Sequence, residues 1–191
     1  MPGDLIILNG PSSAGKSSLV KEMQRLWPRP LYTAGVDTII SGWPGVFYLD
    51  HDESDPMRDS ESLRVVAGLG PAPSWVPKLS GTFLAISRHA LKSWANMSQD
   101  GIDVVIDHCI IDPTEREQAQ SLLVGAFWVG VTCDFEELIH RETVRGDRYV
   151  GFASGTSAVV HQGMNYDMVI DTTSTPPEEL AHKIFDAILH R

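Results

Sequence analysis

A glycine-rich segment near the amino end of the chain has the spacing of a phosphate-binding loop. Residues 10–17 read Gly-Pro-Ser-Ser-Ala-Gly-Lys-Ser, which satisfies the Walker A pattern G-x-x-x-x-G-K-[ST]. Glycines let the backbone curl until its N–H groups converge on a phosphate, and a helix that begins at the loop adds partial positive charge at the same point. We expect Lys16 to reach the β- and γ-phosphates of a nucleotide, and the Ser17 hydroxyl to bind the Mg²⁺ between them. The alternative, a glycine turn that binds nothing, gives the lysine no purpose at this spacing. The residues expected to surround the phosphates are Gly10, Pro11, Ser12, Ser13, Ala14, Gly15, Lys16, Ser17 and Ser18.

Two aspartates follow apolar stretches that read as buried strands. Asp107 comes directly after residues 102–106, where a carboxylate can hold Mg²⁺ directly or through water; the alternatives are a helix cap or a salt bridge. Asp37 follows residues 31–36 and is predicted to be the general base that takes the proton of an acceptor hydroxyl. Its alternative role is to cap a short helix that begins at Thr38.

Arginines gather at the end of a helix predicted to run to Val144. Arg141 and Arg145 are four residues apart and therefore share one face, and Arg148 lies just beyond them. Arginine binds phosphate oxygens through a fixed fork of donors, so we expect a clamp on the transferring phosphate. The alternative is ordinary favourable charge at a helix end, with an ion pair from Arg145 to Glu142 or Asp147.

These side chains must be positioned by alternating strands and helices. Apolar runs and helical periodicity predict the following elements: strands at 5–8, 31–36, 102–106, 126–131 and 166–170, and helices after the phosphate loop to Leu26 and at 81–97, 113–123, 134–144 and 176–189. This rhythm predicts an α/β fold of the P-loop NTPase type, similar to nucleotide and shikimate kinases. Its core is a doubly wound, five-stranded parallel sheet with flanking helices and a lid.

Residues 43–80 differ from the rest because prolines, glycines and an acidic stretch from Asp50 to Glu61 interrupt any periodicity. We expect loops and short helices that form a substrate-binding insert within one domain of residues 1–191, with a basic lid at about 141–157. Aromatic residues in this segment and just after it could line an acceptor pocket or pack as small cores. They are Trp43, Phe47, Tyr48, Trp75 and Phe83.

Composition restricts the function classes. The net charge is −10, which argues against nonspecific binding of nucleic acid or anionic membranes. No apolar run reaches the length of a membrane span and no signal segment precedes the first strand, so we expect a cytoplasmic protein. The two cysteines, Cys109 and Cys133, lie in apolar surroundings and are expected to be buried, reduced thiols. The histidines have no metal-ligand spacing, although His108 and His161 could make polar contacts.

Several segments together resemble the chloramphenicol phosphotransferase family, bacterial kinases that phosphorylate the primary hydroxyl of an antibiotic. The matching stretches are 6–10, 12–17, 35–37, 104–107, 128–131, 133–134, 141–143, 145–148, 159–161, 166–167 and 171–173. The resemblance implies Asp37 as catalytic base, Lys16 and Ser17 as phosphate and metal residues, and the arginines after Glu137, with Thr172, around ATP. The match lapses in residues 43–80, and His108 stands where the family pattern has a second acidic residue.

The sequence therefore predicts an ATP- and Mg²⁺-dependent kinase that phosphorylates a hydroxyl of a small molecule. The catalytic residues are expected to be Asp37, Lys16, Arg141 and Arg145. The resemblance implies an antibiotic acceptor and a role in resistance or self-protection. Two alternatives stay open: a metabolic kinase with a nucleoside or sugar-acid acceptor, and a nucleotide-dependent regulatory switch that is not a kinase.

Overall fold

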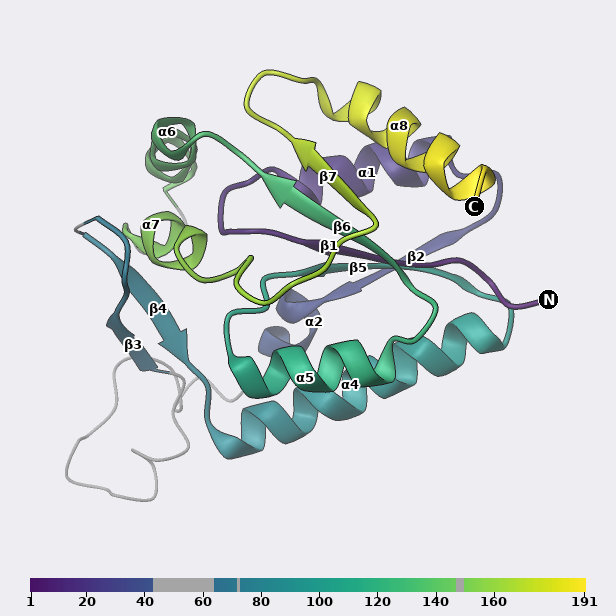
Figure 1. Ribbon diagram of the computed structural model, residues 1–191, viewed down its shortest axis with the longest axis horizontal. Coiled ribbons are helices and arrows are strands. Elements are labelled where there is room, and N and C mark those ends of the chain that lie inside the picture. The colour runs from purple at the N-terminus through teal and green to yellow at the C-terminus, as the bar shows by residue number, and fades with distance from the viewer. Residues whose placement is uncertain (43–63, 72, 147–149) are drawn as a thin grey trace.

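A five-stranded parallel sheet forms the central layer of the protein (Figure 1). The computed structural model describes residues 1–42, 64–71, 73–146 and 150–191. The strands are β1 (Leu5–Asn9), β2 (Leu31–Gly35), β5 (Asp103–His108), β6 (Phe127–Thr132) and β7 (Met168–Asp171). They lie in the order β2-β5-β1-β6-β7, and every neighbouring pair is parallel. The predicted parallel sheet is confirmed, with β7 beginning two residues later than the sequence suggested.

Strand β1 shows why these sequences form a sheet buried on both faces. Ile6 and Leu8 pack into the hydrophobic cluster on one face, and Leu5 and Ile7 pack into the cluster on the other. An uninterrupted apolar run is what such a central parallel strand requires. Asn9, where the run ends, lies at the carboxyl edge of the sheet beside His108 of β5.

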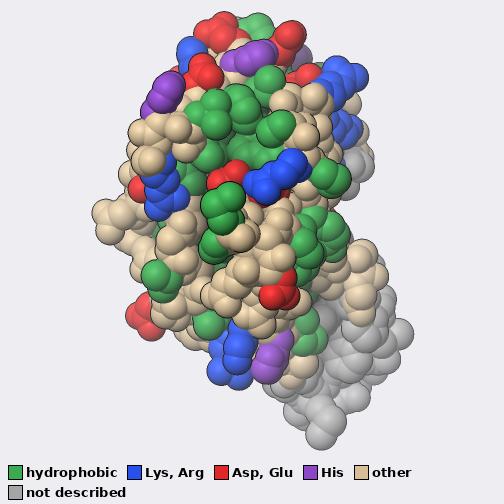
Figure 2. Space-filling model, turned by 90° about the vertical axis from the view of Figure 1, so that its right-hand side faces the viewer, with side chains coloured by type: hydrophobic (Ala, Val, Ile, Leu, Met, Phe, Trp, Pro, Cys, Tyr) green, Lys and Arg blue, Asp and Glu red, His purple; other side chains and the backbone are tan. Residues whose placement is uncertain are grey.

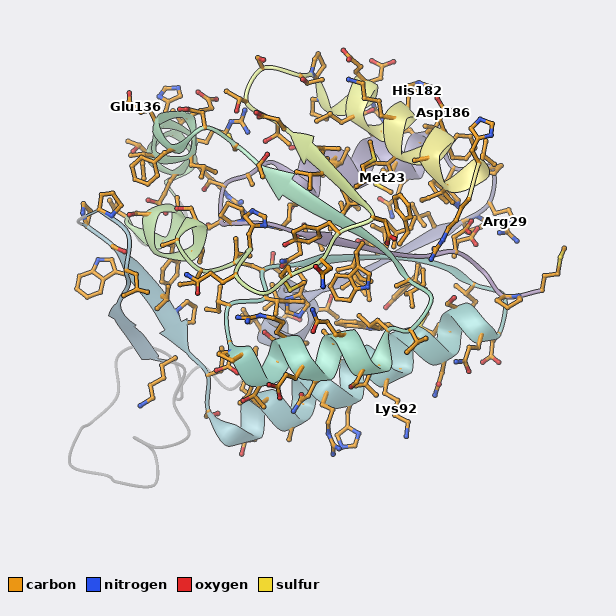
Figure 3. The ribbon with its side chains drawn as sticks, viewed as in Figure 1. Met23, Arg29, Lys92, Glu136, His182 and Asp186 are labelled. Atoms are coloured by element: carbon orange, nitrogen blue, oxygen red, sulfur yellow. The ribbon has the colours of Figure 1, made fainter. Side chains whose placement is uncertain are left out.

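Helices cover both faces of the sheet (Figure 1). The long helices are α1 (Lys16–Leu26) and α8 (Pro177–Leu189) on one face, and α4 (Gly81–Gln99) and α5 (Pro113–Leu122) on the other. Three further helices lie toward the carboxyl ends of the strands: α2 (Val36–Ser41), α6 (Phe135–Arg145) and α7 (Phe152–Ser157). Met23 of α1, labelled in Figure 3, is fully buried in the cluster that α1 and α8 share with the sheet.

The expectation of loops and short helices throughout residues 43–80 is wrong for the described part of that segment. Strands β3 (Arg64–Ala67) and β4 (Trp75–Lys78) pair as an antiparallel hairpin. Prolines and glycines lie in and around these short strands, and such residues normally argue against a strand. Pro77 is compatible with a strand here because β4 pairs only with β3 in this two-stranded sheet, and edge strands tolerate a residue that lacks an N–H donor. The acidic stretch 50–61 lies outside the described residues.

The end of the sheet opposite its carboxyl edge carries both chain termini (Figure 1). Figure 2 faces this end and shows apolar side chains around a small group of charged ones. Arg29, labelled in Figure 3, donates to Asp103 at 2.7 Å here. Cys109 and Cys133 are free thiols, and both side chains are partly buried, less completely than the sequence suggested. No helix among the described residues has the length and apolar character needed to span a membrane.

Candidate active site

The phosphate loop lies between β1 and α1 at the carboxyl edge of the sheet, in the strand–loop–helix context that its motif requires. The side chain of Lys16 is buried, and its ammonium donates to the carbonyl oxygens of Gly10 and Pro11, both at 2.9 Å. The lysine side chain therefore folds back onto the phosphate loop. These carbonyls hold the charge in place where an anion can replace them.

The loop itself has features that suit an anion. Ser13 adopts a left-handed conformation with φ 64°, and its hydroxyl oxygen is buried with no hydrogen-bond partner among the described residues. Gly15, the N-cap of α1, has φ 79° and no side chain to cap the first turn of the helix. The N–H groups at this helix start are thus available to a phosphate, where the helix dipole favours negative charge.

The two predicted metal ligands are in contact. The Ser17 hydroxyl donates to Asp107 Oδ2 at 2.8 Å, and Asp107 Oδ1 lies 3.9 Å from the Lys16 ammonium. A hydroxyl and a carboxylate side by side are the oxygen ligands that Mg²⁺ takes beside bound phosphates. Ser17 and Asp107 therefore fit a magnesium site. Asp107 also forms a salt bridge with Lys16, so the alternative role suggested for this aspartate is present as well.

Asp37 lies inside the first turn of α2, as its second residue. The N-cap of α2 is Gly35, which makes no side-chain cap, so the interpretation of Asp37 as the cap of a helix from Thr38 is wrong. β2 ends at Gly35 and α2 begins at the next residue. At this turn the backbone of Gly35 lies so close to β5 that a Cβ would overlap the Asp107 carbonyl oxygen. Only glycine permits this approach, and it brings the start of α2 beside the end of β5.

Arg141 is held by hydrogen bonds that orient its guanidinium. Its Nε donates to Glu137 at 2.7 Å, and Nη2 donates to the backbone carbonyl of Thr172 at 2.7 Å. Nη1 lies 3.5 Å from the position that a Cβ on Gly15 would take, so the group sits beside the phosphate loop. The Thr172 hydroxyl donates to the Ala14 carbonyl at 2.9 Å. Thr172 therefore joins the arginine to the loop.

A buried carboxylate ties the arginine-bearing helix to its neighbour. Glu142 of α6 is 1% exposed and accepts hydrogen bonds at 2.7 Å from the backbone N–H groups of Gly151 and Ala153. Its oxygens are thus committed to α7, so Glu142 is a structural residue and not the surface partner that sequence suggested for Arg145. Arg148 and Asp147 lie outside the described residues.

Helix α7 in turn holds both the hairpin and the phosphate loop. The Ser154 hydroxyl donates to the Pro71 carbonyl at 2.6 Å, and the Trp75 N–H donates to the Gly151 carbonyl at 3.0 Å. On its other side, Thr156 accepts a hydrogen bond from the Ser12 N–H at 3.0 Å. The described parts of the predicted lid and insert therefore pack against each other.

One cavity of about 320 Å³ joins these groups. Its polar side contains the phosphate loop, Asp37, Asp107, Arg141 and Arg145. Apolar side chains line most of the rest of its surface; they are Val36, Ile40, Pro77, Leu79, Phe83, Cys109, Ile111 and Phe152. Of the aromatic residues singled out in the sequence, Phe83 lines the cavity, whereas Trp75 packs on α7. Enclosure by protein raises the pKa of the Cys109 thiol to about 11, so this thiol contributes no charge at neutral pH.

A second hollow of about 310 Å³ opens on the other side of Arg141. It is lined by Gly15, Ser18, Leu19 and the segment from Thr172 to Pro177, together with Leu180. Hydroxyl groups, a guanidinium and apolar side chains meet here next to the start of α1. This hollow adjoins the phosphate loop, so it is placed to hold the nucleoside of a nucleotide whose phosphates lie in the loop.

Sequence reasoning missed two buried polar residues of the site, Asn9 and Glu115. Asn9 donates to the Tyr166 hydroxyl at 2.8 Å and accepts from the Ile110 N–H, so it braces the loop after β5. The Tyr166 hydroxyl also lies 2.8 Å from His161 Nδ1. Burial, followed by the Lys16 charge, lowers the pKa of His161. Glu115, also missed, lines the cavity, and its position three residues after Asp112 looks like a helix-capping pattern.

Comparison with solved structures defines the class. The APS kinase of Mycobacterium tuberculosis, solved with AMPPNP and APS, superposes with a TM-score of 0.63 at 14% identity, covering 98% of each chain. The shikimate kinase of Acinetobacter baumannii, solved with shikimate, gives a TM-score of 0.56 at 14% identity, covering 100% of this chain and 94% of the kinase. The chain therefore has the P-loop kinase fold.

The family follows from sequence. Residues 3–189 match the family described as chloramphenicol phosphotransferase-like protein. A provisionally named O-phosphotransferase of Mycobacterium tuberculosis, matched in strains CDC 1551 / Oshkosh and H37Rv, is 30% identical over 97% of this chain and 82% of its own length. The chain belongs to the chloramphenicol phosphotransferase-like family, which confirms the resemblance inferred from its motifs.

Proposed function

We propose that this protein transfers the γ-phosphoryl group of ATP to an alcohol of a small molecule with an apolar body. The observation that carries the proposal is that the phosphate loop, Asp37 and an apolar wall border the same cavity. A nucleotide phosphate and an acceptor hydroxyl can meet there without an intervening barrier. Such positioning is the main contribution that a protein makes to phosphoryl transfer.

The phosphate side of the cavity supplies positive charge. Lys16 exchanges its two carbonyl partners for the β- and γ-phosphate oxygens, while Arg141 and Arg145 approach from α6. Ser17 and Asp107 would hold Mg²⁺, and the ion would supply positive charge that neutralises the phosphates. In a protein of net charge −10, this local gathering of cations is what makes a triphosphate site feasible.

The acceptor side supplies the base. Asp37 accepts the proton of the acceptor hydroxyl while that oxygen forms a bond to the γ-phosphorus. The bond between the γ-phosphorus and the bridging oxygen breaks, and ADP leaves with the electron pair. Lys16 and the arginines stabilise the charge on the transferring group throughout. The products are ADP, the phosphorylated acceptor and one proton carried by Asp37.

The remaining surfaces favour a nucleoside on one side and an apolar acceptor on the other. The hollow beside Thr172 receives the adenosine of cytoplasmic ATP. The acceptor lies against Ile40, Phe83 and Phe152, beneath an insert of residues 43–80 and a lid of about 141–157 within one domain. Membership in the chloramphenicol phosphotransferase-like family supports an antibiotic alcohol such as chloramphenicol as the first acceptor to test, and resistance or self-protection as the role.

The test is mass spectrometry of a library of antibiotic and metabolite alcohols after incubation with the protein and MgATP. We expect at least one neutral, apolar alcohol to gain a single phosphoryl group, with ADP formed in equal amount. Replacing ATP by ADP, or chelating Mg²⁺, should abolish the gain. ATP consumption at background with every acceptor, combined with a partner protein that binds only in the presence of ATP, would favour the regulatory switch instead.

A further inference from the structure

Glu115 is a buried carboxylate in the cavity wall for which the proposed transfer reaction has no use. It lies in the first turn of α5 and is 1% exposed, yet it lines the same cavity as Asp37. Its Oε1 accepts a hydrogen bond of 2.6 Å from the Ser87 hydroxyl of α4. A carboxylate withdrawn from water this far is costly unless its oxygens find partners.

His108 lies beside Glu115 and is a second buried polar side chain with an unpaired atom among the described residues. The side chain is 1% exposed, and Nδ1 accepts a hydrogen bond of 2.9 Å from the Cys109 N–H, which places the ring hydrogen on Nε2 in the neutral form. Nε2 lies 3.5 Å from Glu115 Oε1 and has no hydrogen-bond partner among the described residues. The nearby donors thus converge on Oε1, and no residue in the described part of the chain donates to Oε2.

We propose that Glu115 is a specificity-determining residue that accepts a hydrogen bond, through Oε2, from a second hydroxyl or an amide N–H of the phosphoryl acceptor. The inference deepens the proposed function and rests on it. Ser87 positions the carboxylate through its hydrogen bond to Oε1, and His108 Nε2 lies beside the same oxygen. A site built to pair with a donor group discriminates strongly against analogues that lack it, because its own polar atom is then left unpaired.

The acceptor class follows from the rest of the cavity. Its wall is mostly apolar, and its carboxylates are Asp37, Asp107 and Glu115. Like charges brought together in such a site repel, so an acceptor with its own carboxylate is disfavoured. The geometry therefore points to a neutral molecule with an apolar body, an alcohol that reaches Asp37, and a separate donor group that reaches Glu115.

The experiment uses a library of neutral aryl alcohols, including chloramphenicol, each with a matched analogue that lacks the secondary hydroxyl or carries an ester in place of the amide. Binding is measured by ligand-observed NMR, and transfer with MgATP by mass spectrometry. The full-length protein is compared with Glu115→Gln and with Glu117→Gln, an exposed glutamate on the same helix.

We expect the wild type to prefer the donor-bearing member of a pair by about tenfold or more, the effect of a hydrogen bond to a charged group. Glu115→Gln should raise KM for that member by a similar factor, leave kcat nearly unchanged and remove the preference, whereas Glu117→Gln should behave as wild type. Equal binding of the two members of each pair by the wild type overturns the proposal, and this test does not depend on the folding of a variant. A preference that survives in Glu115→Gln also overturns it, as does a library in which no donor-bearing member binds. Binding with the expected preference but without transfer leaves Glu115 recognition standing and contradicts the kinase function.

Discussion

Replacing Glu142 by glutamine should uncouple the arginine-bearing helix from its neighbour. Glu142 accepts two hydrogen bonds of 2.7 Å, from the Gly151 and Ala153 N–H groups, while 1% exposed. In Glu142→Gln one acceptor oxygen becomes an NH2 group that faces an N–H donor, and the other oxygen loses its charge. Hydrogen bonds to charged groups contribute about 1.5–3 kcal/mol each, so we expect a loss of roughly 3 kcal/mol. For a chain of this size that lowers Tm by about 6–12 °C.

Thermal denaturation followed by circular dichroism measures the effect. Glu136→Gln is the matched control, because Glu136 is exposed on the same helix (Figure 3) and should shift stability by no more than about 0.5 kcal/mol. Since α6 also carries Arg141 and Arg145, KM for ATP should rise in Glu142→Gln and stay unchanged in Glu136→Gln. A Tm for Glu142→Gln equal to that of the control would refute the structural role assigned to this carboxylate.

Three further perturbations test other parts of the site. Asp37→Asn should leave ATP binding nearly intact but lower kcat for transfer by orders of magnitude, because the amide cannot take the hydroxyl proton; single-turnover assays with unchanged transfer would remove the base assignment. Gly35→Ala should reduce stability and transfer together, since its Cβ overlaps the Asp107 carbonyl; a variant with wild-type Tm and kcat would contradict this. The pKa of His161 is lower in the folded protein than in the unfolded chain, so the unfolded chain binds the proton first as pH falls. The free energy of unfolding is therefore unaffected by His161 above about pH 6.5 and decreases as pH drops toward and through the lower folded pKa. Tm recorded against pH should show this loss in the wild type and a flatter curve in His161→Asn, and identical curves would count against it.

Much of the phosphate side of the site could be predicted from sequence because its determinants are local. The Walker A spacing fixes the loop, and the apolar run of β1 fixes a central strand, so Lys16 and Ser17 follow without knowledge of distant contacts. Asp107 follows in the same way, because the carboxyl ends of parallel strands meet at one edge of a sheet.

Other features could not be predicted because they depend on contacts between distant segments. Glu115 reads as a helix-capping residue until Ser87 on another helix is seen to bind it, and Glu142 reads as a surface partner of Arg145 until α7 covers it. The position of Asp37 inside α2, and not at its cap, depends on how closely Gly35 approaches the β5 backbone. The hairpin of β3 and β4 was hidden by prolines and glycines that normally argue against strands.

The measurement that tests the proposed function most directly is calorimetric titration of the protein with a non-hydrolysable ATP analogue and Mg²⁺. We expect one site per chain for the wild type, and affinity weakened by about a hundredfold or more in Lys16→Ala, because the ammonium makes charge-assisted bonds to two phosphates. Equal affinity of wild type and Lys16→Ala, or no heat of binding at millimolar nucleotide, would contradict a phosphate site at this loop and with it the transfer reaction.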